Sequence, residues 1–326
     1  MNSAAWRPPA VPLRVEAHPT GYRPHRTHCV QRAWPQANCY LDLWIELLHC
    51  LGHDPIPALA CTLSADHDGV SWTFIKPAPE DLRRLYGLDV AEDNAWLPTV
   101  DLIELGSQRG VLHTVEVDGW WLPDTAGTSY RHEHLKTAIT PTSMRRRQRV
   151  MRYLHNSGLY ELAGEDFDGI FGTDARPVTA LAPYIEVIRN RPDLIEPDVL
   201  STIVGEHLAR RPSDNPIVRL ADCVGDATGW LADGDLARFH RWAFASIRQC
   251  GATAELLADF VEHIDGICPG AAAAAAPFRT VATQTKLMQF KLARIPTGRK
   301  VDVTETLSVM TESWQTGMDI VSAAAG

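Results

Sequence analysis

The sequence predicts an α+β domain followed by an all-helical domain, and three features of the chain indicate this fold class. Apolar residues recur at helical spacing within residues 36–52. Runs that alternate in polarity and are rich in β-branched residues follow, up to residue 162. From residue 176 onward the pattern is amphipathic and helical almost throughout. A helix followed by a group of strands, without regular alternation of the two, is typical of the α+β class.

The first helix is predicted over residues 36–52. Leu41, Trp44 and Leu48 fall at helical spacing, and Gly52 supplies the stop signal. Asn38 is a favourable N-cap residue, so we expect Cys39 in the first helical turn.

The remaining elements of the first half follow from local signals. Clusters of aspartate, glycine and proline separate short runs of strand-forming residues, and a glycine closes a short helical run. We expect strands over 58–63, 71–75 and 111–117, short helices over 80–86 and 101–105, and two later strands that carry His134 and Asn156.

The second half is predicted to be entirely helical. Several of its segments begin with proline or aspartate, which favour helix starts. The predicted helices cover residues 181–189, 197–210, 216–231, 235–249, 252–267, 277–293 and 303–318. With a linker near 172–177, the chain divides into an extended arm (1–35), an α+β domain (36–175) and a helical domain (176–326).

The composition excludes several classes of protein. A formal net charge of −9 argues against a nucleic-acid partner, because the chain has no basic excess and the run Arg145–Arg147 is short and isolated. No apolar stretch is long enough to span a membrane, and the proline-rich N-terminus lacks the features of a secretory signal. The seven cysteines form no C-x-x-C pair, which argues against a structural zinc site. Because the chain shows no export signal, we expect free thiols in a cytoplasmic protein.

Cys39 is the candidate nucleophile. The unpaired N–H groups and the dipole at a helix start favour negative charge, and therefore the thiolate of a cysteine. The alternative interpretation is a small buried residue at a helix start. Gln36 and Asn38 could supply an oxyanion donor beside the Cys39 backbone N–H, although Asn38 fits equally well as a plain N-cap.

A base and an orienting residue follow Cys39 in the chain. His134 stands at the start of a predicted strand, and Asn156 ends the next one. A thiolate–imidazolium pair needs a third group to orient the ring, and an Asn or Asp side chain can do this. His132 is the rival base, since alternation places it on the same face as His134. Asn156 fits equally well as a turn residue.

Other residues near these positions are candidates for substrate binding or for a metal, and Asp118, Asp124 and His132 are expected near the substrate. Trp120 and Trp121 could line an acyl channel, although paired aromatics at a strand end are more often packing residues. A zinc site is a weaker alternative, because no helical H-x-x-x-H pattern accompanies the candidates. Its ligands would come from His132, His134, His155, Asp118 and Asp124.

Several motifs resemble a bacterial family known as domain of unknown function 1839. These motifs are NCYLDLWIE at 38–46, WLPDTAGT at 121–128, HNSG at 155–158, FHRWAFA at 239–245 and QFKLAR at 289–294. More distantly, the first half is similar to the papain-like N-terminal domain of the butirosin-pathway acyltransferase. That resemblance rests on a cysteine at a helix start, a "D-x-Y-Y-L-P" loop matched by residues 118–123, and a later histidine. Here Trp120 and Trp121 replace the tyrosines of the loop.

The resemblance implies a papain-like fold and acyl transfer without a cofactor. Cys39 would be the nucleophile and His134 the base, with residues 118–123 as the aromatic loop. The donor would be an acyl or aminoacyl carrier-protein thioester, and the acceptor an amine or a thiol. A cysteine peptidase or amidase with the same residues is the runner-up. A non-catalytic binding or scaffold protein is the third hypothesis.

Overall fold

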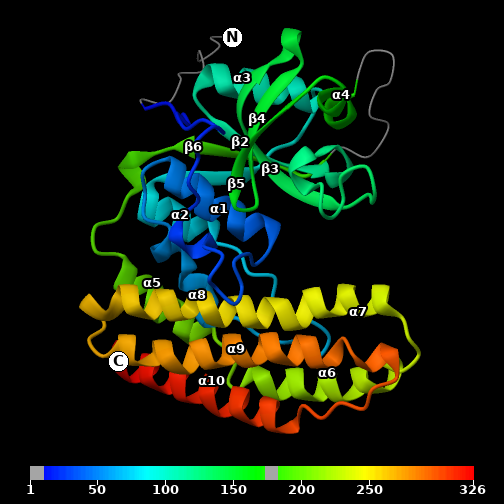
Figure 1. The fold of residues 1–326 in the computed structure, drawn as a ribbon. Helices are drawn as coiled ribbons and strands as arrows, with labels where there is room; N and C mark the ends of the chain where they lie inside the picture. The colour runs from blue at the N-terminus through cyan, green and yellow to red at the C-terminus, as the bar shows by residue number, and fades with distance from the viewer. Residues whose placement is uncertain (1–10, 173–182) are drawn as a thin grey trace. The chain divides into compact units, whose positions relative to one another are not determined.

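The computed structural model describes residues 11–172 and 183–326 (Figure 1). The chain forms two compact units that are interleaved along the sequence. The first, here called the sheet unit, takes residues 1–25, 39–55 and 78–197. The second, the helical unit, takes residues 26–38, 56–77 and 198–326. The predicted linker over 172–177 lies almost wholly outside the described residues.

A six-stranded antiparallel sheet forms the centre of the sheet unit, with strand order β1-β6-β2-β3-β4-β5. Hairpins join β2, β3, β4 and β5 in sequence, and β6 enters between β1 and β2. The strands are β1 (Leu88–Glu92), β2 (Leu112–Asp118), β3 (Lys136–Arg145), β4 (Val150–His155), β5 (Gly158–Ala163) and β6 (Ile185–Asn190).

The two faces of the sheet are covered by different helices (Figure 1). Helix α1 (Cys39–Cys50) packs against β3 and β4 on one face. Helices α3 (Thr99–Arg109) and α4 (Glu165–Phe171) contribute Ile103 and Phe167 to an apolar cluster on the other. That cluster includes Val115 and Tyr153 from the strands. Helix α2 (Pro79–Tyr86) contacts β1 and ends at Gly87, whose φ of 67° suits a helix C-terminus.

The predicted α+β class is confirmed, but some elements differ from the prediction. Residues 185–190 form β6 rather than the predicted helix over 181–189, because a short apolar run in a buried strand resembles a buried helix turn. The predicted strands over 58–63 and 71–75 are also wrong. The 3₁₀ helix Ile56–Ser64 replaces the first, and an isolated bridge between His67 and Trp72 stands near the second.

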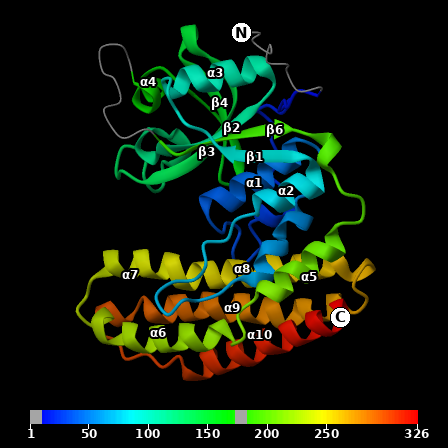
Figure 2. The ribbon, with the colours of Figure 1, turned by 180° about the vertical axis from the view of Figure 1, so that it is seen from behind.

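The helical unit is all-helical after residue 198, as predicted. A single π-helical turn, Phe244–Arg248, joins α7 to α8 without a break. Helices α8, α9 and α10 run side by side (Figure 2), with α9 packed on both of the others. The helices are α5 (Leu200–Arg210), α6 (Pro216–Leu231), α7 (Leu236–Ala243), α8 (Gln249–His263), α9 (Ala275–Leu292) and α10 (Thr304–Ala325). No helix in the described part of the chain combines the length and apolarity that a membrane crossing requires.

His113 on β2 should make the stability of the protein depend on pH. Its side chain is only 4% exposed, and burial lowers the pKa of the imidazole to about 4. Between about pH 6.5 and pH 4 the unfolded chain binds a proton at this position that the folded chain does not. As the pH is lowered through this window, the free energy of unfolding should therefore decrease, by up to about 1.4 kcal/mol per pH unit from this group.

Urea unfolding across this pH range would measure the effect. His113→Gln should flatten the profile below pH 6.5 relative to the parent. An unchanged slope in the variant would show that His113 is not the group responsible.

Candidate functional site

Cys39 is the first residue of α1, which confirms the predicted helix start. Its side chain is partly exposed, and the thiol is free, like those of the other six cysteines. The N-terminal end of a helix carries unpaired N–H groups and a partial positive charge, both of which favour a thiolate. Within the described residues, the structure records no hydrogen bond between the Cys39 thiol and a histidine. The expected direct pair with His134 is therefore not formed.

His134 is instead paired with Asp118. Its Nδ1 lies 2.6 Å from Oδ2 of Asp118, and the His134 side chain is 70% exposed. The other carboxyl oxygen of Asp118 accepts a hydrogen bond of 3.0 Å from the backbone N–H of Trp120. The Trp120 ring stacks on the imidazole, with centroids 4.5 Å apart and planes within 10°. Asp118 and Trp120 together fix the orientation of the ring, the role that the sequence assigned to Asn156.

A buried carboxylate lies on the α1 side of the sheet. Glu186 on β6, 4% exposed, accepts hydrogen bonds from three hydroxyl groups. The Tyr40 hydroxyl, next to Cys39 in the chain, donates over 2.7 Å, Thr114 over 2.6 Å and Tyr184 over 3.0 Å. Burial, and secondly the charge of Glu186, raises the pKa of Tyr184 to about 12 and also raises the pKa of Tyr40. Both phenols therefore remain protonated donors at neutral pH.

The His134–Asp118 pair lies on the same face of the sheet as α1. Successive side chains of a strand point to opposite faces, so Thr114, Glu116 and Asp118 share one face of β2. Tyr40 identifies this face as the one that α1 covers, since Tyr40 and Thr114 bind the same carboxylate. Polar groups continue along the face toward His134, including an ion pair of 2.6 Å between Glu116 and Lys136. Cys39, at the start of α1, and His134 thus lie on the same side of the sheet, with no hydrogen bond recorded between them.

Asn156 is a turn residue. It follows β4 in the two-residue loop before β5, with a φ of 46° that asparagine tolerates better than most residues. Its side-chain nitrogen lies 3.5 Å from Nδ1 of the neighbouring His155, at the outer limit of a hydrogen bond.

A second histidine–aspartate pair, not predicted from the sequence, lies on the opposite face. Nδ1 of His155 is 2.6 Å from Oδ2 of Asp124, and its Nε2 is 2.8 Å from the Thr137 hydroxyl. The Tyr153 hydroxyl donates to the other oxygen of Asp124 over 2.5 Å. The side chains of His155 and Asp124 are only 2% and 3% exposed. Asp124 was expected near substrate, but here it accepts two bonds in the interior.

The spacing of Tyr153 and His155 was the available signal for this second pair. Residues two apart on a strand share a face. From the sequence, His155 was expected only as an alternative metal ligand.

The other predicted site residues have varied surroundings. Trp121 packs under the Arg131 guanidinium and against Gly169, where an added Cβ would lie 2.0 Å from the indole ring. His132 is exposed in the loop before β3, not on the strand. Gln36 and Asn38 belong to the helical unit, whose Arg248 donates to the carbonyl of Gln36. The Asn38 side-chain amide donates to the carbonyl of Ile75 over 2.9 Å.

Two family models match the chain. The DUF1839 N-terminal domain matches residues 23–190, and the DUF1839 C-terminal domain matches residues 195–323. The chain belongs to the DUF1839 family. The division between the two DUF1839 domains falls close to the end of the sheet unit at residue 197. A search of curated proteins finds no match to this chain.

The described residues of this DUF1839 protein were searched for a cluster of metal-ligating side chains. They contain no group of three histidine, cysteine, aspartate or glutamate side chains placed to hold a metal ion. The arginine run lies exposed at the β3–β4 turn, where Arg145, Arg146 and Arg149 pair with acidic side chains of the same unit.

The two aspartate–histidine pairs of the DUF1839 chain should differ sharply in their effect on stability. Asp124→Ala removes the acceptor of two buried donors and should lower the free energy of unfolding by about 2–5 kcal/mol. Asp118→Ala breaks a pair of the same length at the surface and should cost less than about 1 kcal/mol. Urea unfolding of both variants tests the contrast, and equal losses would contradict it.

Proposed function

We propose that the sheet unit is a cysteine-dependent acyl or aminoacyl transferase that takes its acyl group from a carrier-protein thioester. One observation carries the proposal: a partly exposed cysteine opens α1 on the same sheet face as an exposed, carboxylate-oriented histidine. A thiolate needs stabilisation and access, and the acceptor needs a base. Cys39 meets the first requirement and His134 the second, and both lie on the same side of the sheet.

Transfer would proceed in two steps. The Cys39 thiolate attacks the thioester carbonyl, forming an acyl–sulfur bond to Cys39 and releasing the carrier thiolate, which takes a proton from solvent. An amine then attacks the acyl-enzyme, loses its proton to Nε2 of His134, and expels the Cys39 thiolate. Backbone N–H groups at the start of α1 are suited to stabilise the oxyanion in both steps.

The Asp118–His134 arrangement supports a base that acts on the acceptor. Nδ1 of His134 is held by Asp118, so Nε2 is the nitrogen left to accept a proton. Because the thiolate is favoured by the helix start, it does not require contact with His134 in the free protein. Substrate bound between the two groups would connect them. A papain-like relationship for this unit is part of the same proposal.

Hydrolysis is the second candidate, with the same residues and water as the acceptor. The 70% exposure of His134 favours it, because solvent reaches the base freely. A cysteine peptidase or amidase would use this reaction.

Hydroxamate formation tests the transferase directly. Aminoacyl thioesters of N-acetylcysteamine, and of carrier protein, serve as donors, and hydroxylamine serves as the amine. The parent should form hydroxamate faster than the protein-free reaction, Cys39→Ala should form it no faster than that uncatalysed reaction, and the enzymatic rate of His134→Gln should be lower by about 10²–10⁴-fold. Cys223→Ala is the matched control, since Cys223 is also partly exposed, and it should retain the parent rate.

The outcomes separate the hypotheses. Free acid in place of hydroxamate, lost in Cys39→Ala, would identify a hydrolase. Activity that survives Cys39→Ala would contradict the proposal, as would the absence of both products with every donor, which would favour a binding or scaffold protein.

A further inference from the structure

A pocket lies on the α3 side of the sheet unit, on the face opposite to α1. Its volume is about 360 Å³, within the range of small-molecule sites. It is bounded by α3, by the loop that precedes α3, and by strands β2 and β6. The lining residues used below are Trp96, Leu102, Leu105, His113, Val187 and Arg189.

The wall of this pocket carries a buried polar atom without a partner. His113 is 96% buried, and its Nδ1 has no hydrogen-bond partner among the described residues. Buried polar groups in native proteins are nearly always paired, so such an atom points to a missing partner. Gly106 of α3 makes room for the ring, since an added Cβ would lie 2.2 Å from Cε1 of His113.

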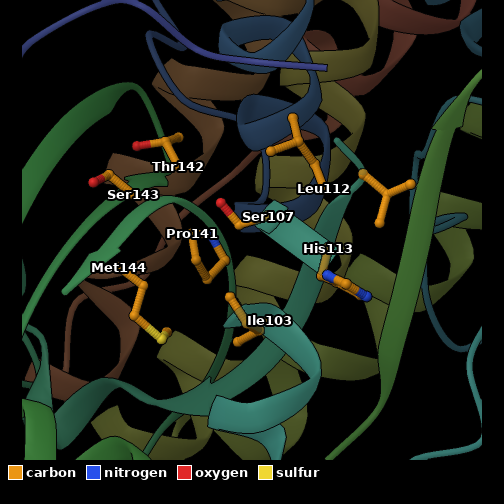
Figure 3. A pocket seen from close by; sticks show the side chains of 9 residues that line it. Ile103, Ser107, Leu112, His113, Pro141, Thr142, Ser143 and Met144 are labelled. Carbon is orange, nitrogen blue, oxygen red and sulfur yellow. The ribbon is translucent and has the colours of Figure 1, made fainter. Parts of the chain in front are cut away.

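A second, smaller hollow also borders His113, but it is too small to hold an organic ligand. It has a volume of about 10 Å³, the lower limit for one water molecule. Figure 3 shows this hollow with the His113 ring extending away from Pro141 and Met144.

The lining of the larger pocket is mostly apolar, and its charged side chains carry more positive than negative charge. Leu102, Leu105 and Val187 provide apolar walls. Two arginines, Arg109 and Arg189, and one acid, Asp93, are the charged lining residues. Arg189 is only loosely engaged, with 3.8 Å to Asp89 and a side chain 44% exposed. Its guanidinium is therefore available to bind a carboxylate.

Trp96 adds an aromatic surface to the same pocket. It is 82% exposed, the highest exposure among the large aromatic side chains of the described residues. An exposed tryptophan that lines a pocket is suited to cover the apolar part of a ligand.

We propose that this pocket binds a small organic carboxylate, with its apolar body against Leu102, Leu105 and Trp96, its carboxylate on Arg189 and a polar contact to His113. The site is independent of Cys39 and His134, because α1 and α3 cover opposite faces of the sheet. The inference therefore does not rest on the proposed transferase activity.

Calorimetric titration of the full chain tests the pocket. The probes are phenylacetate and octanoate, each matched with its neutral amide, in the millimolar range. The parent should bind at least one carboxylate, about tenfold more tightly than the amide, as expected for a charge-assisted hydrogen bond. Arg189→Gln should remove this preference and leave amide binding unchanged. Trp96→Ala should weaken both ligands.

Arg145→Gln is the matched control. Arg145 also lies on a strand of the sheet, is exposed, and has an acidic partner at 3.7 Å. The control should bind like the parent. Absence of binding by both carboxylates would overturn the proposal. Carboxylate binding that survives both Arg189→Gln and Trp96→Ala would also overturn it, because the probe would then bind elsewhere.

Discussion

The alternation of side chains along β2 decides which residues of the sheet unit can act together. Thr114, Glu116 and Asp118 point to the face that α1 covers, whereas His113 and Val115 point to the face of α3. Antiparallel pairing extends this separation to β3, β4 and β6. Cys39 and the Asp118–His134 pair therefore border one face. The carboxylate pocket and the Asp124–His155 pair lie on the other.

The two aspartate–histidine pairs have the same geometry but differ in burial, and this difference decides whether the histidine can react with a substrate. Both have a carboxyl oxygen 2.6 Å from a histidine Nδ1. The Asp118–His134 pair is open to solvent, so its free nitrogen can exchange protons with a substrate. In the Asp124–His155 pair every polar end is occupied, because Thr137 and Tyr153 bind the histidine and the aspartate. The buried Asp124–His155 pair, with Thr137 and Tyr153, is therefore suited to a structural role in which it connects β3, β4 and the loop after β2.

Local signals in the sequence were sufficient where one stretch of chain determines the structure. The cap-and-helix pattern located the start of α1 at Cys39, and the glycine after Tyr86 located the end of α2. The sequence could not identify β6, because its apolar run becomes a strand only through pairing with β1 and β2. The partner of His134 depends on the turn after β2, where Asp118 binds the Trp120 N–H and faces the loop that enters β3. Order along the chain favoured Asn156 instead, although a φ of 46° makes it a turn residue.

The central claim is that Cys39 carries the acyl group during transfer. Peptide mass spectrometry of the protein, quenched in acid after brief exposure to an aminoacyl thioester and an amine acceptor, locates any covalent intermediate. The account predicts the acyl mass on the peptide that contains Cys39, and a larger amount of it in His134→Gln, where attack by the amine is slowed. An acyl group on another residue, or equal amounts in parent and variant, would contradict the account.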